Sequence, residues 1–457
     1  MTVFERTLDL PVSCGEAFAW HARAGAFPRL TPPWQDTRVT SQTFADGADT
    51  LLADGGVAQL SIPIGPVRVS WTARHSGYQP GRQFIDSMEG GPFSRWVHTH
   101  RFEPAPGGCT LIDHIDYDLG AAGLVVGRSM ARDLDRLFSF RHARTLADLA
   151  AHTRHPGGGT VAITGATGLL GTALGAFLTT GGHPVRRFGR SGKVGDIGWD
   201  PGSGSIDTGG LLGVDTVVHL AGASIAERWT DAHKADVMES RRLGTRLIAR
   251  TLADLRRAGE PGPRTLISAS AVGIYGDREE EELTEDGVPG SGFAAEVCKV
   301  WEASTAEAED AGIRVVHLRL GVVLSARGGA LAQMLPPFRA GLGGPVGSGR
   351  QWLPWVADDD VLDTIATAMD DDRRRGPINV VSPGITRQRD FAHALGEALG
   401  RPALLPAPAF AIRGVFGEMG RELLLGGQHV LPRRLQDAGF EWRRPDLRGA
   451  LAWELGG

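Results

Sequence analysis

A glycine-rich turn between an apolar run and a helical stretch is the feature that most limits how this chain can fold. The run Val161–Thr164 is short, apolar and rich in β-branched residues, and the Leu/Ala-rich stretch Leu170–Leu178 has helical character. The sequence GATGLLG occupies residues 165–171 between them. A strand, a tight turn and a helix N-terminus in this order present free N–H groups and the positive end of the helix dipole to a pyrophosphate. The turn therefore predicts a dinucleotide-binding unit.

Each glycine of the turn has its own predicted task. Gly165 permits the turn, Gly168 lets the backbone approach a phosphate, and Gly171 lets the helix pack closely on the strand. Thr167, Leu169 and Leu170, between these glycines, are predicted to contact the coenzyme as well. The alternative is a glycine-rich loop without a ligand, which the flanking strand and helix argue against.

With 457 residues the chain is long enough for two or three domains. Residues 152–159 are rich in turn formers and poor in apolar side chains, so we expect them to link two domains. Residues 1–151 contain strand-like runs and a final segment with apolar residues at helical spacing. This pattern predicts an antiparallel sheet that grips one long helix; its segments are Val57–Ile64, Val67–Arg74, Arg95–Phe102, Thr110–Leu119 and Val125–Ala151.

Strand-like and helix-like segments alternate in residues 160–384, which predicts an α/β domain with a doubly wound parallel sheet, the Rossmann fold. The expected strands include Val185–Phe188, Thr216–Leu220, Arg264–Ser268 and Arg314–Leu318, and the expected helices Ala232–Arg257 and Phe293–Asp310. Residues 385–457 are mixed and interrupted by Pro and Gly. They suit a small α+β cap, with helical stretches at Gln388–Leu399 and Gly417–Leu425, over the sheet edge where ligands bind in such folds.

The second domain resembles the extended short-chain dehydrogenase/reductase superfamily, in its atypical branch of NAD(P)-dependent sugar-epimerase-like proteins. The resemblance covers residues 160–457 and rests on an ordered set of motifs: TGATGLLG (164–171), HLAG (219–222), RWT (228–230), SRRLGT (240–245), SASAVGIYG (268–276), VCKVWE (297–302), LRLGVVLS (318–325), GLGGPVGSGRQWLPWVADDD (341–360) and RPALLPAP (401–408). The first domain resembles the SRPBCC helix-grip superfamily, which includes START-like and polyketide-cyclase-like proteins, through WHARAGAFPRLTPPW (20–34) and GPFSRWVHTHRF (91–102). Members of that superfamily commonly enclose an apolar ligand, so the resemblance implies one here.

The expected coenzyme is NADP(H), with NAD(H) the less favoured alternative. A Rossmann domain that prefers NAD usually places an acidic residue at the end of its second strand. This chain has no acid there before Asp196, whereas Arg190 and Ser191 could hold a 2′-phosphate. Further coenzyme contacts implied by the resemblance come from strand ends and the following helix: His219, Leu220, Ala221, Gly222, Ser240, Ser268 and Ala269. His219 itself is expected to be a packing residue rather than an acid or base.

The superfamily catalyses hydride transfer with a Ser or Thr, a Tyr, and a Lys four residues after that Tyr. Ser270 matches the serine, and Tyr275 is the only tyrosine of the second domain, but Glu279 stands where its lysine should be. The helix that normally carries the pair has Phe293 and Val297 at those positions. Ser270 and Tyr275 are therefore the catalytic candidates, with a packed loop tyrosine as the alternative for Tyr275.

Four further residues are candidates for substrate binding, by their place in the family pattern: Lys234, Arg241, Arg350 and Trp352. Three consecutive aspartates, 358–360, are expected to begin a helix rather than bind a metal, because consecutive side chains point in different directions. In the first domain His98 and His100 alternate and so share one strand face, with Asp113 or Tyr117 opposite. Two histidines without a clear third ligand do not make a metal site, so we expect none.

Composition limits the functional classes. The net charge of −5 argues against a nucleic-acid partner, and no apolar run approaches membrane-spanning length. Three scattered cysteines and the absence of a secretion signal favour a cytoplasmic protein with reduced thiols. Two hypotheses follow: an NADP(H)-binding oxidoreductase or epimerase acting on a small molecule, or a catalytically degenerate protein whose binding or regulatory role depends on NADP(H).

Overall fold

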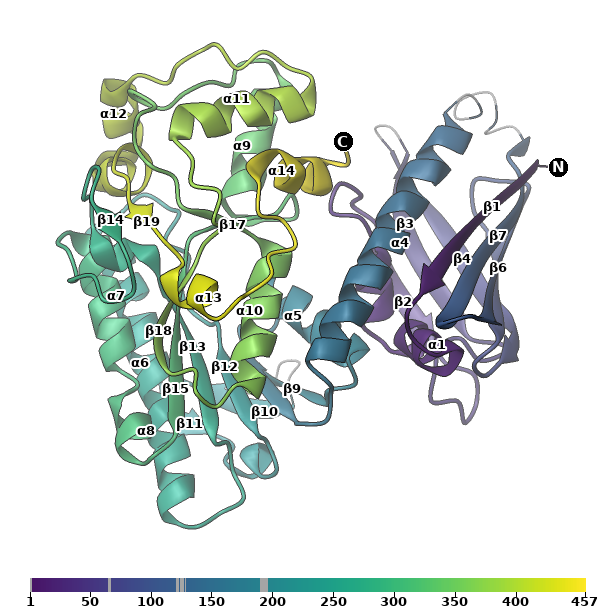
Figure 1. Cartoon of the computed structure of the whole chain (residues 1–457), viewed down its shortest axis with the longest axis horizontal. Coiled ribbons are helices and arrows are strands. Elements are labelled where there is room, and N and C mark those ends of the chain that lie inside the picture. The colour runs from purple at the N-terminus through teal and green to yellow at the C-terminus, as the bar shows by residue number, and fades with distance from the viewer. Residues whose placement is uncertain (1, 65–66, 121–122, 124–126, 128, 190–195) are drawn as a thin grey trace. The chain divides into compact units, whose positions relative to one another are not determined.

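The computed structural model describes residues 2–64, 67–120, 123, 127, 129–189 and 196–457. The chain divides into two compact units (Figure 1). The first comprises residues 1–157 with 176–183 and 456, and the second comprises 158–175, 184–455 and 457.

In the first unit, the described residues form a seven-stranded antiparallel sheet in the order β1-β7-β6-β5-β4-β3-β2, with one long helix, α4 (Met130–Arg154), against it. Burial alternates strictly along β7, so every second side chain faces the helix. Ile115 and Tyr117 pack there with Leu134 and Phe138 of α4. The elements are β1 (Thr2–Leu10), α1 (Cys14–Ala22), α2 (Ala26–Leu30), β2 (Arg38–Thr43), β3 (Val57–Ile64), β4 (Val67–Gln79), β5 (Gln83–Gly90), β6 (Arg95–Ala105) and β7 (Gly108–Asp118). This is the predicted helix-grip fold.

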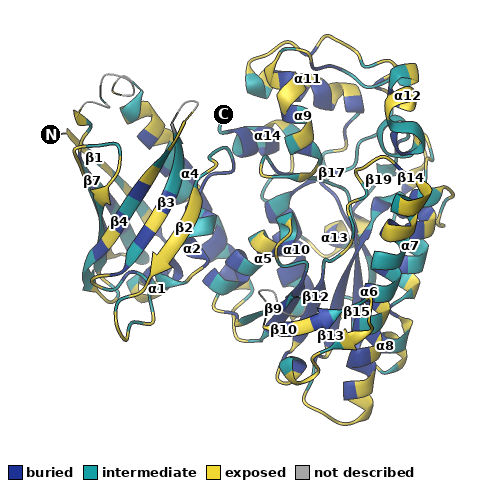
Figure 2. Cartoon of the chain, turned by 180° about the vertical axis from the view of Figure 1, so that it is seen from behind, coloured by how far each residue is buried: buried dark blue, intermediate teal, exposed yellow. Residues whose placement is uncertain are grey.

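Three strands of this sheet, β1, β2 and β5, are absent from the sequence prediction. All six residues of β2 are exposed (Figure 2), so that strand lacks the apolar alternation that marks the others. The helix α4 continues to Arg154, and residues 152–154 of the predicted linker are therefore helical. Residues 125, 126 and 128, near the start of the predicted helix, lie outside the described residues.

The second unit is built on an eight-stranded sheet, within the described residues, in the order β11-β10-β9-β8-β12-β13-β15-β18. All neighbouring strands run parallel except β10 and β11. The strands are β8 (Val161–Thr164), β9 (Val185–Gly189), β10 (Ile197–Asp200), β11 (Ser205–Ile206), β12 (Thr216–His219), β13 (Thr265–Ala271), β15 (Arg314–Leu320) and β18 (Gly376–Val380). Buried side chains dominate the central strands (Figure 2), and the predicted Rossmann fold is confirmed.

The helices that flank this sheet are α5 (Leu169–Thr180), α6 (Asp231–Arg257), α7 (Phe293–Ala303), α8 (Ala306–Asp310) and α10 (Asp358–Asp370). A further helix, α9 (Gly329–Arg339), packs instead in a core with Phe391 and Leu451 of the C-terminal part. The helix predicted over residues 293–310 is divided into α7 and α8. At the break, Ser304 Oγ donates to the carbonyl of Val300 and Thr305 Oγ1 to that of Glu302. Such bonds from side chain to backbone compete with the helical hydrogen bonds and favour an interruption.

The C-terminal part contains α11 (Gln388–Leu399), α12 (Ala409–Met419), the π-helical turn η4 (Gly420–Leu425), α13 (Arg433–Asp437) and α14 (Leu447–Leu455). The predicted stretch Gly417–Leu425 is thus the end of α12 and η4. Two small parallel pairs accompany these helices: β14 (Glu282–Leu283) with β19 (His429–Val430), and β16 (Val322–Leu324) with β17 (Trp355–Ala357). Phe391, Leu395 and Leu451 share a core with Leu324 and Trp355, which joins the cap to the sheet domain.

The three cysteines are free thiols, although Cys14 Sγ and Cys109 Sγ lie 2.6 Å apart. Among the described residues, no helix combines the length and the hydropathy that crossing a bilayer requires.

Candidate nucleotide site

The glycine turn has the predicted strand–turn–helix geometry. Gly165 has a φ of +65°, and its carbonyl accepts a 2.9 Å hydrogen bond from the Gly168 N–H. Thr167 and Gly168 are exposed at the tip, and Leu169 and Leu170 are half-buried in the first turn of α5. A Cβ on Gly171 would collide with the Gly165 carbonyl oxygen and would lie 2.8 Å from the Ala166 Cα. The turn is therefore as tight as close packing of helix on strand requires.

Thr164 ties the ends of β8 and β12 together. Its Oγ1 accepts hydrogen bonds from the N–H groups of Leu220 (3.0 Å) and Ala221 (3.2 Å). His219 is fully buried, with Nδ1 2.8 Å from Thr164 Oγ1 and Nε2 3.0 Å from Thr245 Oγ1. Burial, with a smaller contribution from Arg241, lowers the pKa of His219 to about 4. His219 is consequently a neutral packing residue that holds the two strand ends in register.

Arg241, which was predicted to bind substrate, lies beside Gly222 at the edge of the sheet where the nucleotide is predicted to bind. Its Cζ is 3.3 Å from the place a Cβ on Gly222 would take, and its Nη1 donates to the carbonyls of Ala223 (3.0 Å) and Val237 (3.1 Å). The guanidinium lies 4.6 Å from the centre of the Trp301 ring. Its Nε is buried without a hydrogen-bond partner among the described residues. Because burial lowers the pKa of Arg241 and no carboxylate contacts it in the described part of the chain, this positive charge is uncompensated.

The neighbouring Ser240 fixes the loop after β12, because its Oγ accepts from the Ala223 N–H and donates to the Val237 carbonyl. Ser268 and Ala269, in the middle of β13, are buried. Their side chains therefore pack inside the domain, and their backbone takes part in the pairing of β13 with β12 and β15. Arg190 and Ser191 lie outside the described residues; the last described residue before them is Gly189, at the end of β9.

The two catalytic candidates belong to one buried polar network. Ser270 Oγ donates to Glu302 Oε1 (2.7 Å), and Arg319 contacts both oxygens of Glu302 at 2.9 Å. Tyr275 OH accepts from Arg319 Nη1 (2.9 Å) and donates to Asn379 Oδ1 (2.7 Å). Tyr275 is 0% and Ser270 1% exposed. Burial outweighs the effect of Arg319 and raises the pKa of Tyr275, so its phenol stays protonated.

The helix α7, where the superfamily carries its Tyr–Lys pair, presents no acid–base pair here. Val297 is buried, and the Lys299 Nζ forms an exposed ion pair with Glu296 at 2.7 Å. Phe293 packs edge-on against Trp229, with ring centroids 4.8 Å apart. The residues at the expected catalytic positions therefore contribute apolar contacts.

Lys234 connects α6 to the cap. Its Nζ is 2.9 Å from Glu418 Oε2 and 4.6 Å from the centre of the Phe293 ring. A second cap residue, Glu422, accepts hydrogen bonds from the N–H groups of Phe293 and Ala294 and so caps α7. These contacts occupy Lys234 and place two cap carboxylates at the N-terminal ends of α6 and α7.

Trp352 and Arg350 lie in the loop before β17. The Trp352 ring stacks on His429 (centroids 4.2 Å apart) and has the Arg387 guanidinium 3.7 Å from its centre. Its Nε1 donates to Glu280 Oε2 at 3.1 Å, so the indole is held by protein groups. Arg350 is exposed. The aspartates 358–360 form the first turn of α10, as the sequence predicted.

Sequence reasoning missed the residues that organise the buried network, namely Glu302, Arg319 and Asn379. Glu302 and Arg319 stand inside the motifs VCKVWE and LRLGVVLS. The available signal was an ionisable residue inside an otherwise apolar strand or helix, which is rarely buried without a partner.

Three segments of the chain match known protein families. Residues 161–381 match the NAD dependent epimerase/dehydratase family, residues 10–138 match the family of polyketide cyclases/dehydrases and lipid transport proteins, and residues 407–454 match a domain of unknown function (DUF1731). An epimerase family protein of Mycobacterium bovis is 39% identical over 296 residues, which are 64% of this chain and 96% of that protein.

Two solved structures extend the comparison. A crystal structure of a nucleoside-diphosphate sugar epimerase from Corynebacterium glutamicum is 33% identical, with a TM-score of 0.78, and the match covers 100% of this chain and 90% of that one. The human epimerase family protein SDR39U1, crystallised with NADPH, is 34% identical with a TM-score of 0.59, covering 65% of this chain and 99% of that one.

Proposed function

Because this chain belongs to the NAD-dependent epimerase/dehydratase family, we propose that it binds NADP(H) at the carboxyl ends of β8 and β12 and exchanges hydride with a small molecule held beneath the cap. The human relative solved with NADPH supports this choice of coenzyme. The coenzyme supplies the hydride, so the protein has to bind and orient both reactants.

The proposal rests on one observation: the glycine turn and the uncompensated positive charge of Arg241 lie at the same edge of the sheet. The turn offers N–H groups of the first turn of α5, and Arg241 brings a buried positive charge to Gly222, in the loop that follows β12. A buried charge without a counter-ion is costly. An anionic nucleotide at this edge would neutralise the charge and satisfy the N–H groups at the same time.

Arg190→Gln is expected to weaken NADPH binding by about ten- to one hundred-fold, because one charge-assisted contact to the 2′-phosphate contributes about 1.5–3 kcal/mol. The affinity for NADH, which lacks this phosphate, should not change. Titration calorimetry with both coenzymes measures the difference. Arg187→Gln is the matched control, because Arg187 is an exposed arginine of β9. Equal discrimination in both variants would contradict the assignment of Arg190, and no heat with either coenzyme in the unmodified protein would contradict nucleotide binding.

A second candidate function is a protein that binds a ligand or partner in response to NADP(H) without turnover. Two observations favour this candidate. Ser270 and Tyr275 are buried in a network whose hydrogen bonds are satisfied, and apolar residues, Phe293 and Val297, stand at the usual catalytic positions. Thermodynamic linkage then requires reciprocity: if NADP(H) changes the affinity for the ligand by some factor, the ligand changes the affinity for NADP(H) by the same factor. Equal ligand affinity with and without NADPH would eliminate this candidate.

Two conservative variants separate catalytic from structural roles. From their contacts, Tyr275→Phe and Ser270→Ala are expected to lower the free energy of unfolding by about 1–2 kcal/mol, because each leaves a buried partner unsatisfied. NADPH oxidation with a panel of carbonyl compounds and nucleotide sugars should remain within threefold of the unmodified protein. A loss of turnover of a hundred-fold or more, with stability and NADPH affinity unchanged, would instead make the altered residue catalytic.

The first unit is proposed to hold a small apolar molecule between its sheet and α4, in line with the family match to polyketide cyclases and lipid transport proteins. Mass spectrometry of the native protein would detect such a ligand and any copurified coenzyme together. A cytoplasmic location stays a prediction from the scattered cysteines.

A further inference from the structure

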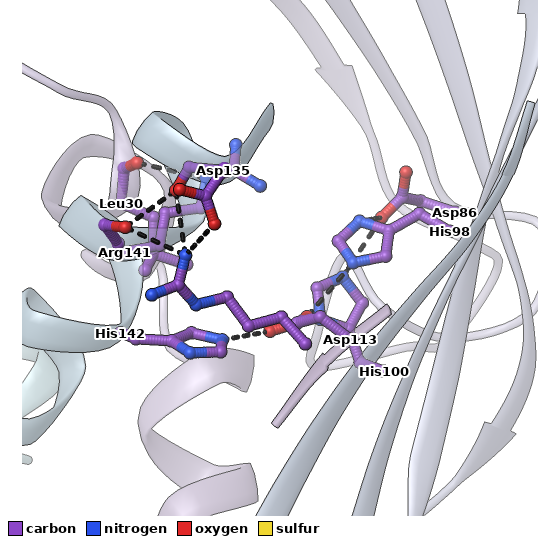
Figure 3. Close-up of polar contacts among 10 residues, drawn as sticks. Leu30, Asp86, His98, His100, Asp113, Asp135, Arg141 and His142 are labelled. Atoms are coloured by element: carbon purple, nitrogen blue, oxygen red, sulfur yellow. Dashed lines mark hydrogen bonds and ion pairs between the residues drawn. The ribbon is translucent and has the colours of Figure 1, made fainter. Parts of the chain in front are cut away.

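Four ionisable side chains from three adjacent strands meet inside the first unit (Figure 3). Asp86 of β5 lies directly across from His98 of β6, and Asp113 of β7 lies directly across from His100 of β6. Residues directly opposite in antiparallel strands share a face of the sheet, so all four project toward the same side. His98, His100 and Asp113 are 3%, 7% and 3% exposed.

The two imidazoles present one nitrogen each to a single oxygen of Asp86. His98 Nδ1 is 3.5 Å and His100 Nε2 is 3.2 Å from Asp86 Oδ2. Two ligands that bind a tetrahedral zinc ion at about 2.0–2.1 Å lie roughly 3.3 Å from each other. One ligand atom from each of the three residues lies within 4.8 Å of the others, so they can surround one ion with small side-chain movements.

The other nitrogen of each imidazole faces the second carboxylate. His98 Nε2 is 3.0 Å and His100 Nδ1 is 2.7 Å from Asp113 Oδ1, although the His100 contact is not aligned as a hydrogen bond. Asp113 Oδ2 is in turn 2.7 Å from His142 Nε2 on α4. Histidines that bind a metal commonly donate their remaining N–H to a carboxylate, which fixes tautomer and ring orientation. Asp113 occupies that outer position.

The charges of the cluster favour a cation. Asp86 and Asp113 place two carboxylates against the two imidazoles. Arg141, whose Nε donates to the Leu30 carbonyl at 3.3 Å (Figure 3), is also close enough for its charge to interact with Asp113 and Asp86. The two carboxylates outnumber the one guanidinium, so a cation held between the imidazoles would lie in a net negative environment.

We propose that Asp86, His98 and His100 bind one divalent first-row transition-metal ion, with Asp113 as the outer carboxylate that orients both imidazoles. Two imidazoles and one carboxylate suit zinc, iron(II), cobalt(II) or nickel(II) better than magnesium or calcium. Three protein ligands leave at least one coordination position for water or for an oxygen of a molecule held between sheet and helix. The sequence shows two alternating histidines; the fold adds the third ligand from the neighbouring strand.

The test uses the full-length, tag-free protein after treatment with a chelator and dialysis. Titration with Co²⁺ and Zn²⁺, followed by calorimetry and by the visible absorption of Co²⁺, should show one ion per chain with a micromolar or lower Kd. Asp86→Asn should weaken binding at least a hundred-fold, and Asp113→Asn ten- to a hundred-fold. His114→Gln, which changes a histidine of β7 that pairs with Glu5 outside the cluster, should leave it unchanged.

Circular dichroism establishes that each variant is folded. If Asp86→Asn does not fold, the Co²⁺ spectrum of the unmodified protein decides, because coordination by imidazole in a four- or five-coordinate site intensifies and shifts the absorption relative to the hydrated ion. The proposal would be overturned if Asp86→Asn bound the metal as strongly as the unmodified protein. It would also be overturned if the unmodified protein gave no heat, or if its Co²⁺ spectrum were identical to that of the free ion.

Discussion

Gly171→Ala is expected to lower the free energy of unfolding of the second unit by about 3 kcal/mol and to abolish detectable NADPH binding. The added methyl would collide with the Gly165 carbonyl oxygen and would lie 2.8 Å from the Ala166 Cα and the Gly165 carbonyl carbon. All three are backbone atoms of the turn, so the clash can be relieved only if the turn itself moves. Denaturant unfolding and calorimetry with NADPH measure the two effects.

The same helix provides a matched control. A Cβ on Gly175 would meet no atom within 4 Å among the described residues, and the backbone there is helical. Gly175→Ala should therefore stabilise the protein by about 0.5–1 kcal/mol, because alanine restricts the unfolded chain more than glycine does. Full NADPH affinity in Gly171→Ala would show that the turn does not hold the pyrophosphate.

Glu302→Gln is expected to destabilise the protein by about 3 kcal/mol, since it leaves the buried Arg319 charge without its carboxylate. The side chains of Arg319 and Glu302 are 7% and 14% exposed, and Ser270 donates to the same carboxylate. Glu296→Gln is the control on the same helix: its ion pair with Lys299 is exposed, so the loss should stay below about 0.5 kcal/mol.

The pH dependence of unfolding gives an independent check. Burial alone would raise the pKa of Glu302, but Arg319 lowers this pKa below the ordinary glutamate value of 4.5. A carboxyl group with a lowered pKa stabilises the fold above the unfolded pKa, and this stabilisation is lost as the pH falls through the folded pKa. The unmodified protein should therefore lose stability below about pH 4.5 more steeply than Glu302→Gln. Parallel profiles would show that the Arg319–Glu302 pair does not stabilise the fold.

The nucleotide half of the candidate site could be predicted because its determinants are local. A strand, a turn and a helix N-terminus are encoded in eleven consecutive residues, and Gly165, Gly168 and Gly171 each have a steric reason to be glycine.

The catalytic half could not be predicted in the same way. Whether the hydroxyls of Ser270 and Tyr275 face a ligand depends on Glu302, Arg319 and Asn379, which lie 32, 44 and 104 residues away from their partners.

The metal cluster illustrates the same limit within the first unit. The alternation of His98 and His100 is visible in the sequence, whereas Asp86 and Asp113 reach them only through strand pairing on either side of β6. Two histidines on one strand gave no reason to expect a metal. The register of β5, β6 and β7 brings the two carboxylates, Asp86 and Asp113, to these histidines.

The amino-acid sequence by itself determined the two-domain order, the grip of a sheet on one helix, the Rossmann alternation and the glycine turn. These depend on hydrophobic periodicity and on backbone conformations that only glycine adopts easily, both of which are local properties. Only the tertiary structure decided which polar groups are buried and what they contact: the saturated environment of Tyr275, the unpaired charge of Arg241 and the convergence on Asp86. Burial and electrostatic pairing arise between residues distant in the chain, so no local pattern encodes them.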